Sequence, residues 1–259
     1  MVGKYVYLKS DKEKILYQIN EVLDELYIVI GVYFRILKTC KIDEIVIASE
    51  NECLIEKNRN DNKLKRLEQI NMRNKKYHCG VILHIDGDSD YLNRCIELYQ
   101  KVGVYSYGVK INEKDIRSEI KKYIIGLNPD VIVITGHDSY NGEGLKDLGN
   151  YTNTGYFCEA VKEIRKFRSK SDVVVIAGAC QSNFEALIAS GANFASSPKR
   201  LNIHTYDPAV LAIKAATTDF KKIISINNIE KYIENGKDAF GGVESFGKMR
   251  MLLWERMRK

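Results

Sequence analysis

Two short apolar runs, each followed by a chemically reactive residue, decide the fold of this chain. They are Val131-Ile132-Val133-Ile134, which leads into Thr135-Gly136-His137-Asp138, and Val173-Val174-Val175-Ile176, which leads into Ala177-Gly178-Ala179-Cys180-Gln181-Ser182. β-Branched runs of this kind, without polar interruption, are typical of strands buried on both faces of a parallel sheet. Ligands of such sheets bind beyond the carboxyl ends of the strands. We therefore expect His137 and Cys180 to lie at a reactive edge.

The pattern around these runs predicts an α/β domain with a doubly wound, mainly parallel sheet of the flavodoxin-like or caspase-like kind. Strands are expected at residues 81–85, 104–109, 131–134, 173–176, 192–195 and 223–226. They alternate with helical patterns near 92–99, 115–125, 154–167, 184–188 and 208–216. Strands that alternate with helices of this length indicate βαβ units.

The first 50 residues predict a different unit, a small β-barrel domain. Runs rich in Tyr, Val and Ile occupy residues 4–8, 15–22, 26–37 and 44–48, with Gly31 as an expected bulge or bend. The resulting organisation is a β-barrel domain at 1–55, a basic connector at 56–78 and an α/β domain at 79–259. We expect the connector to be helical around Leu64, Leu67, Ile70 and Met72.

Composition narrows the class of protein. Hydrophobic residues make up 45% of the 259 and charged residues 29%, as in ordinary globular proteins. We expect neither a membrane span nor a secretory signal. The six cysteines include no CxxC pair, which favours reduced thiols over disulfides or zinc. Residues 56–76 carry eight Lys or Arg and three Asp or Glu, more typical of a solvated helix face than of a nucleic-acid platform.

Cys180 is the candidate nucleophile. It stands between a buried strand and a predicted helix that begins at Gln181, and a helix N-terminus favours the thiolate. Small neighbours leave room for a substrate carbonyl, and the Cys180 N–H could face a developing oxyanion. We therefore expect Cys180 to be exposed and the most reactive of the cysteines. The alternative is a buried thiol that merely packs, as we expect for Cys95 and Cys158.

His137 is the candidate proton shuttle, since a thiol nucleophile usually needs an imidazole beside it. If the strands before His137 and Cys180 are consecutive in a right-handed βαβ unit, they can be neighbours, roughly 5 Å apart. His78 and His84 are expected to be structural. His204 is the fallback base.

The spacing of the pair resembles that of caspase- and clostripain-type cysteine peptidases, in which Ala-Cys follows a strand about fifty residues after the histidine. Here the separation is 43 residues. Those enzymes have glycine after the histidine, and its N–H helps to line the oxyanion hole. This chain has Asp138 there, so the second oxyanion donor stays open among the supporting residues Gly136, Asp138 and Gln181.

A closer resemblance, from about residue 80 to 245, is to the YabG family of sporulation cysteine peptidases. It rests on seven stretches: His84-Ile-Asp-Gly-Asp-Ser-Asp-Tyr-Leu92, Val133-Ile-Thr-Gly-His-Asp138, Ile176-Ala-Gly-Ala-Cys-Gln-Ser182, Phe184-Glu-Ala-Leu-Ile188, Gly191-Ala-Asn-Phe-Ala-Ser-Ser-Pro-Lys-Arg200, Asn202-Ile-His204 and Gly241-Gly-Val-Glu244. The resemblance implies a protease of sporulating Gram-positive bacteria that acts in the mother cell near the forming coat. It also implies spore-coat and germination-related substrates, cleaved after basic residues, arginine above all.

Three acidic residues complete the candidate site. Asp86 or Asp88, after the first α/β strand, could orient the imidazole, receive a basic substrate side chain, or serve only the turn. Asp207 is an alternative specificity acid. We expect no cofactor and no metal. A Cys-His amidase or glutaminase, or a nucleic-acid-binding barrel with an inert α/β domain, remain alternative functions, and the sequence leaves the oligomeric state open.

Overall fold

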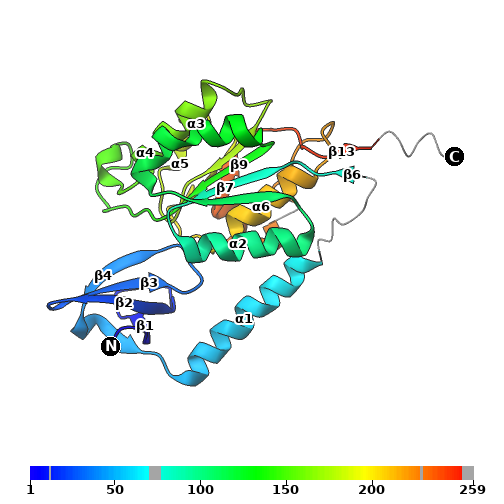
Figure 1. The fold of residues 1–259 in the computed structure, drawn as a ribbon. Helices are drawn as coiled ribbons and strands as arrows, with labels where there is room; N and C mark the ends of the chain where they lie inside the picture. Colours follow the sequence, from blue (N-terminus) through cyan, green and yellow to red (C-terminus); the bar gives the residue numbers. More distant parts are fainter. Residues whose placement is uncertain (12, 70–76, 228–229, 253–259) are drawn as a thin grey trace.

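The computed structural model describes residues 1–11, 13–69, 77–227 and 230–252 of the chain. Figure 1 shows an antiparallel N-terminal sheet, a long helix α1 that leaves it, and an α/β domain whose central sheet has helices on both faces. No helix in these four ranges is long and apolar enough to cross a membrane.

The N-terminal sheet has five antiparallel strands in the order β4-β3-β2-β1-β5. Its strands are β1 Tyr5–Leu8, β2 Tyr17–Leu23, β3 Leu26–Gly31, β4 Leu37–Lys41 and, after the 3₁₀ turn η1 Ile42–Glu44, β5 Ile45–Ile47. The prediction of a barrel is wrong: β4 and β5 form the two edges, and no ladder joins them in the part of the chain described. A closed barrel would need a ladder between the two edge strands, with all strands tilted and staggered. The edge strand β5 has only three residues for such a ladder.

The predicted single strand over 26–37 is two strands, β3 and β4, separated by residues 32–36. Gly31 marks the bend, because a Cβ there would lie 2.4 Å from the carbonyl oxygen of Phe34. The intervening segment turns toward the α/β domain. There Phe34 forms a bridge with His204, and the Arg35 N–H donates to the Ile203 carbonyl at 2.9 Å.

Helix α1 runs over Glu50–Glu68 and begins six residues before the predicted connector. A capping box starts it: the Ser49 side chain accepts from the Glu52 N–H, and the Glu52 carboxylate accepts from the Ser49 N–H. The helix at Leu64 and Leu67 is confirmed. Ile70 and Met72 lie outside the described residues.

The central sheet has the order β12-β11-β10-β9-β7-β8. Its strands are β7 Ile82–Asp86, β8 Ser106–Lys110, β9 Val131–Thr135, β10 Val174–Ala177, β11 Phe194–Ser196 and β12 Phe240–Gly242. The five strands β7 to β11 are parallel and follow the flavodoxin-like order. The strand predicted at 223–226 is wrong. The sheet instead ends in β12, which runs antiparallel to β11, and Ile223 forms only an isolated bridge with Phe246.

The remaining elements surround this sheet. The helices are α2 Ser89–Val102, α3 Ile116–Leu127, α4 Thr154–Arg165, α5 Phe184–Ser190 and α6 Asp207–Thr217. Short 3₁₀ turns lie at η2 Glu113–Asp115, η3 Leu148–Asn150, η4 Glu230–Tyr232 and η5 Gly236–Asp238. Strands β6 Tyr77–His78 and β13 Arg250–Met251 pair in a separate ribbon.

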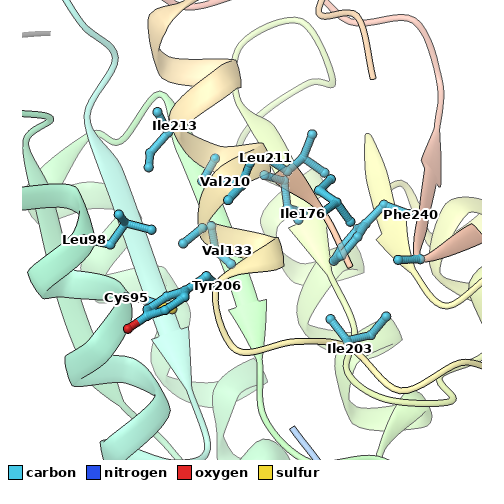
Figure 2. Close-up of a cluster of buried hydrophobic side chains, with 14 of the residues drawn as sticks. Cys95, Leu98, Val133, Ile176, Ile203, Tyr206, Val210, Leu211, Ile213 and Phe240 are labelled. Atoms are coloured by element: carbon cyan, nitrogen blue, oxygen red, sulfur yellow. The ribbon is translucent and has the colours of Figure 1, made fainter. Parts of the chain in front are cut away.

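Alternate residues of the strands face two hydrophobic clusters. Val133 and Ile176 belong to the first cluster, with α2, α6 and the N-terminal sheet; Ile132 and Val175 belong to the second, with α3, α4 and α5. Figure 2 shows side chains of α6 against Val133 and Ile176, with Cys95 and Leu98 of α2 alongside. Cys180 is part of the first cluster, so the N-terminal sheet and the candidate nucleophile share one core.

Candidate active site

Four strands that are adjacent in the sheet are each followed by a candidate polar residue. In the spatial order β8-β7-β9-β10, these residues are Glu113, Asp88, His137 and Cys180. The predicted adjacency of the strands before His137 and Cys180 is confirmed, because Val131 pairs with Val174 and Ile134 with Ala177 in a parallel ladder. The carboxyl edge of the sheet therefore carries an imidazole, a thiol and two carboxylates.

A tight turn after β10 holds Cys180. Gly178 has φ +107°, and a Cβ there would lie 2.4 Å from Ser196 Oγ, so only glycine fits. The Ala179 N–H donates to Ser182 Oγ at 2.9 Å, and Ser196 Oγ donates to the Ala179 carbonyl at 2.8 Å. Helix α5 begins only at Phe184, with Asn183 as its N-cap. The prediction that Cys180 directly precedes a helix is wrong, since the Asn-capped turn intervenes.

The Cys180 sulfur is fully buried and held by one residue. The Ile203 N–H donates to Sγ at 3.1 Å, and Sγ lies 3.8 Å from the Ile203 carbonyl oxygen. Burial raises the pKa of the thiol to about 12, although the Ile203 N–H and the Arg35 charge act in the opposite direction. The expectation of an exposed thiolate is therefore wrong for this state of the molecule.

The N-terminal sheet forms part of the cover over the Cys180 thiol. Tyr17 on β2 belongs to the same buried cluster as Cys180, and burial, followed by the Asp11 hydrogen bond, raises the pKa of its hydroxyl. Tyr91 of α2 packs beside His137, and its hydroxyl donates to the Phe34 carbonyl at 2.8 Å. Both tyrosines are almost completely buried.

His137 is bound at one ring nitrogen and unpaired at the other. Its Nε2 lies 3.1 Å from Asp88 Oδ2, whereas Nδ1 is buried and has no partner. The ring lies 5.6 Å from the Tyr91 ring, centroid to centroid. No hydrogen bond joins His137 to Cys180 in the described residues. An Nε2–H donated to Asp88 leaves Nδ1 as the basic nitrogen.

Asp88 has two tasks at the start of α2. Its Oδ1 caps the helix by accepting the N–H groups of Asp90 and Tyr91, at 2.8 and 3.1 Å, while Oδ2 faces His137. Burial opposes ionisation of this carboxyl, but the hydrogen bonds from His137 and the Tyr91 N–H outweigh it and lower its pKa. Asp88 is therefore a carboxylate that can hold an imidazolium.

Asp138 joins the histidine loop to the cysteine turn through its side chain. Its carboxylate accepts from the Asn153 N–H at 2.7 Å, from Ser182 Oγ at 2.7 Å and from the Thr154 hydroxyl. Burial raises the pKa of Asp138 in spite of these bonds. The Asp138 side chain thus links the loop of His137 to the turn of Cys180.

Backbone N–H groups near the thiol differ in their availability. The Gln181 N–H donates to the Leu201 carbonyl at 3.1 Å, and the Gln181 Oε1 accepts from the Tyr140 N–H. The N–H groups of Cys180 and Asp138 donate to no protein acceptor within the described ranges. Gly136 lies against the Glu113 carboxylate. The N–H groups of Cys180 and Asp138 are therefore the ones available to another acceptor.

Asp86 joins the central sheet to the segment that follows β3 of the N-terminal sheet. Its carboxylate forms a fully buried ion pair with Arg35 and accepts from Thr135 Oγ1 at 2.7 Å. Burial alone would raise the pKa of Asp86, but the Arg35 charge holds it well below its usual range. His84 binds Tyr99 and the same Thr135 at 2.9 Å each, and burial lowers its pKa. The network reaches His137 only indirectly: Asp86 Oδ1 accepts the Asp88 N–H at 2.9 Å, and Asp88 in turn contacts His137.

His204 lies against residues 32–36, and Asp207 lies against α1. Asp207 Oδ1 pairs with Lys63 at 2.8 Å, while Oδ2 is buried without a partner. Burial raises the pKa of Asp207 to about 6. His204 packs against Tyr33 and Phe34, and burial keeps its pKa well below the usual value. A cavity of about 40 Å³ beside them is lined by Phe34, Lys63, His204 and Glu234 among others.

Sequence reasoning missed Arg35 and Glu113. Arg35 interrupts the apolar run Val32-Tyr33-Phe34-Arg35-Ile36-Leu37, and a lone charge in such a run was the available signal. Glu113 follows a strand at the same edge as the other candidates, which the strand prediction could have indicated. No group of three or more His, Cys, Asp or Glu is arranged to hold a metal in the residues the structure covers.

Comparison with known proteins identifies the family of this chain. Residues 1–253 match the family model described as YabG peptidase U57. A curated relative, the sporulation-specific protease YabG of Bacillus subtilis (strain 168), is 41% identical over 175 residues, which cover 66% of this chain and 60% of the relative. The match thus spans about three fifths of the relative's length. The chain belongs to the YabG peptidase U57 family.

Proposed function

We propose that this chain is a cysteine endopeptidase with Cys180 as nucleophile and His137 as proton shuttle. The observation that carries the proposal is the pair of parallel strands β9 and β10, which end in the loop of His137 and the turn of Cys180. Membership of a peptidase family supports the reaction type. The order of histidine and cysteine along the chain is also that of caspase-type cysteine peptidases.

In this mechanism, His137 Nδ1 removes the thiol proton as Cys180 Sγ attacks the scissile carbonyl carbon. The protonated ring then gives its proton to the leaving amine, and the acyl group stays on sulfur as a thioester. Water, deprotonated by the same ring, hydrolyses the thioester. Asp88 holds Nε2–H and stabilises the imidazolium, while the N–H groups of Cys180 and Asp138 bind the oxyanion.

The buried thiol implies that catalysis begins with a local opening. Sγ must leave Ile203 and approach His137, and the substrate must displace part of the cover formed by the N-terminal domain. In enzymes without bound substrate, the hydrogen bonds between catalytic residues are often long, and they shorten only when substrate binds. The covered state is therefore a resting form of the same site.

Asp207 is the proposed specificity acid. Its Oδ2 is a buried acceptor without a partner, and its Oδ1 already binds the ammonium of Lys63. A basic substrate side chain would satisfy the first oxygen or replace Lys63 at the second. The proposed substrates are spore-coat and germination-related proteins, cut after Arg or Lys in the mother cell, in keeping with a relative named as a sporulation-specific protease.

The test compares wild type with Cys180→Ala on a set of peptides that differ in the residue before the scissile bond. We expect cleavage after Arg, complete loss in Cys180→Ala, and a raised KM for Arg peptides in Asp207→Asn. A Cys180→Ala protein that folds normally and cleaves normally would remove the proposal. Hydrolysis of a free carboxamide, with peptides left intact, would indicate an amidase instead.

A further inference from the structure

Glu113 contacts the candidate histidine through the backbone. It lies in η2, just after β8, and its Oε1 accepts the His137 N–H at 2.9 Å. The hydrogen bond spans 24 residues of sequence and crosses from the end of β8 past the β7 loop to the β9 loop. A charged acceptor on a backbone N–H is stronger than a neutral one. The bond therefore fixes the peptide that carries His137.

Two glycines make room for this carboxylate. A Cβ on Gly87 would lie 2.2 Å from Glu113 Oε1, and a Cβ on Gly136 would lie 2.3 Å from the same atom. Neither glycine has a positive φ, so the backbone itself would accept alanine. The glycines precede Asp88 and His137 directly. The loops that carry the imidazole and its carboxylate partner thus both close around Glu113.

We propose that Glu113 is a positioning residue for the His137–Asp88 pair. This inference rests on the proposed function of His137. By holding the His137 N–H and filling the space between residues 87 and 136, Glu113 sets the distance between the two loops. It thereby sets the 3.1 Å contact of His137 Nε2 with Asp88 and the direction of the neighbouring Asp138 N–H.

The first experiment measures kcat and KM on one arginine peptide for Glu113→Ala, Glu113→Gln and the control Glu119→Ala, whose exposed carboxylate pairs with Lys122. A misplaced catalytic group can cost about 10²-fold, so Glu113→Ala should lower kcat by about 10- to 100-fold with little change in KM. Glu113→Gln keeps an oxygen acceptor and should retain both the rate and the pH profile. Equal effects of Gln and Ala, or a shifted pH profile in Glu113→Gln, would show that charge and not position matters.

A double-mutant cycle tests the geometry. Gly136→Ala leaves Glu113 in place but pushes its carboxylate away from the His137 N–H, so we expect a loss comparable with that of Glu113→Ala. In the Glu113→Ala background the methyl group has free space, and Gly136→Ala should add no further loss. Independent, additive losses would overturn the proposal, because additivity is expected only of residues that do not share a contact.

A measurement without turnover separates this inference from the proposed function. In Cys180→Ala protein, the nitrogen chemical shifts of the His137 imidazole report whether Nε2 remains bound to Asp88. We expect Glu113→Ala to change them and Glu119→Ala to leave them unchanged; unchanged shifts in both would refute the positioning role. Should Cys180→Ala and His137→Ala both retain full peptidase activity, the proposed function would fail instead, whatever the shifts show.

Discussion

The carbonyl oxygen of Ile203 is shared by Cys180 and Arg35. It accepts the Arg35 N–H at 2.9 Å and lies 3.8 Å from Cys180 Sγ, while the Ile203 N–H donates to the same sulfur at 3.1 Å. One residue thus contacts both the candidate nucleophile and the segment that docks the N-terminal domain. Movement of residues 32–36 therefore acts directly on the environment of the thiol.

Cys180 should be protected from alkylation in the resting protein. Its sulfur is fully buried and burial raises its pKa to about 12, so both access and thiolate content are low at neutral pH. Cys53, the one cysteine in the described residues that is partly exposed, should react first with iodoacetamide. Peptide mapping at successive times gives the order, and early labelling of Cys180 would mean that the cover opens frequently.

His137 and His204 should differ sharply when each is replaced by alanine. Loss of a general acid–base group lowers rates by about 10²–10⁴-fold, so kcat/KM of His137→Ala should fall by that amount. His204 is buried between aromatic rings, so its variant should lose stability more than intrinsic rate. Activity is compared per folded molecule, with folding followed by circular dichroism. A reversed ranking would transfer the proton shuttle to the loop before Asp207.

Asp88 allows its two tasks to be separated. Asparagine is as good an N-cap as aspartate, so Asp88→Asn should keep the stability of α2 while it weakens the hold on the His137 imidazolium. Asp88→Ala should lose the cap as well and reduce the free energy of unfolding by about 1 kcal/mol. Urea unfolding and kcat/KM are measured on both variants. Full activity in Asp88→Asn would leave Asp88 with the cap alone.

The sequence predicted the central sheet well because its strands are buried on both faces. Uninterrupted β-branched runs such as 131–134 and 173–176 have no other stable location, and their order along the chain restricts the topology. The adjacency of the two strands that precede His137 and Cys180 followed from that order. The prediction of a strand at 223–226 failed because this short run has no partner strand and buries only Ile224, whereas Ile223 is exposed.

The state of the site could not be predicted, because it depends on contacts between distant segments. The apolar residues around Arg35 continue the pattern of β3, so nothing in the periodicity indicates that residues 32–36 leave the sheet. The burial of Cys180 follows from the docking of that segment on Ile203. Local sequence patterns can place the thiol at the end of a strand, but they do not show which distant segments cover it.

Asp207 should give the protein a distinct pH dependence. Burial raises its folded pKa to about 6 from an unfolded value of 3.8, so its contribution to stability is complete below the unfolded value and is lost as the pH rises through about 6. The free energy of unfolding of Asp207→Asn, relative to wild type, should therefore increase from pH 4 to pH 6. Asp172→Asn is the control: hydrogen bonds with Ser169 lower the pKa of Asp172, so its effect has the opposite sign and falls below the unfolded value of 3.8, and its difference from wild type should stay nearly flat from pH 4 to pH 6. If the difference in free energy of unfolding between Asp207→Asn and wild type did not change with pH, burial would not raise the pKa of Asp207.

The buried pair of Arg35 and Asp86 should couple the stability of the domain interface to access at the thiol. Both side chains have no exposed surface, and removal of one partner leaves an uncompensated charge, which typically costs about 3–5 kcal/mol. Arg35→Met should therefore lower the free energy of unfolding by that amount. It should also speed alkylation of Cys180, because the 32–36 segment loses its anchor.

The matched variants distinguish an interface effect from general destabilisation. Arg35→Met combined with Asp86→Asn leaves no unpaired charge, so the double variant should be more stable than the sum of the single losses predicts, while Cys180 stays accessible. Lys14→Ala, which breaks the exposed pair with Glu52, should change neither quantity much. Iodoacetamide rates at Cys180 and urea midpoints are measured on wild type, the two single variants, the double variant and Lys14→Ala. If Cys180 remained protected in Arg35→Met while the unfolding midpoint fell, the cover over the thiol would have to come from the α/β domain itself.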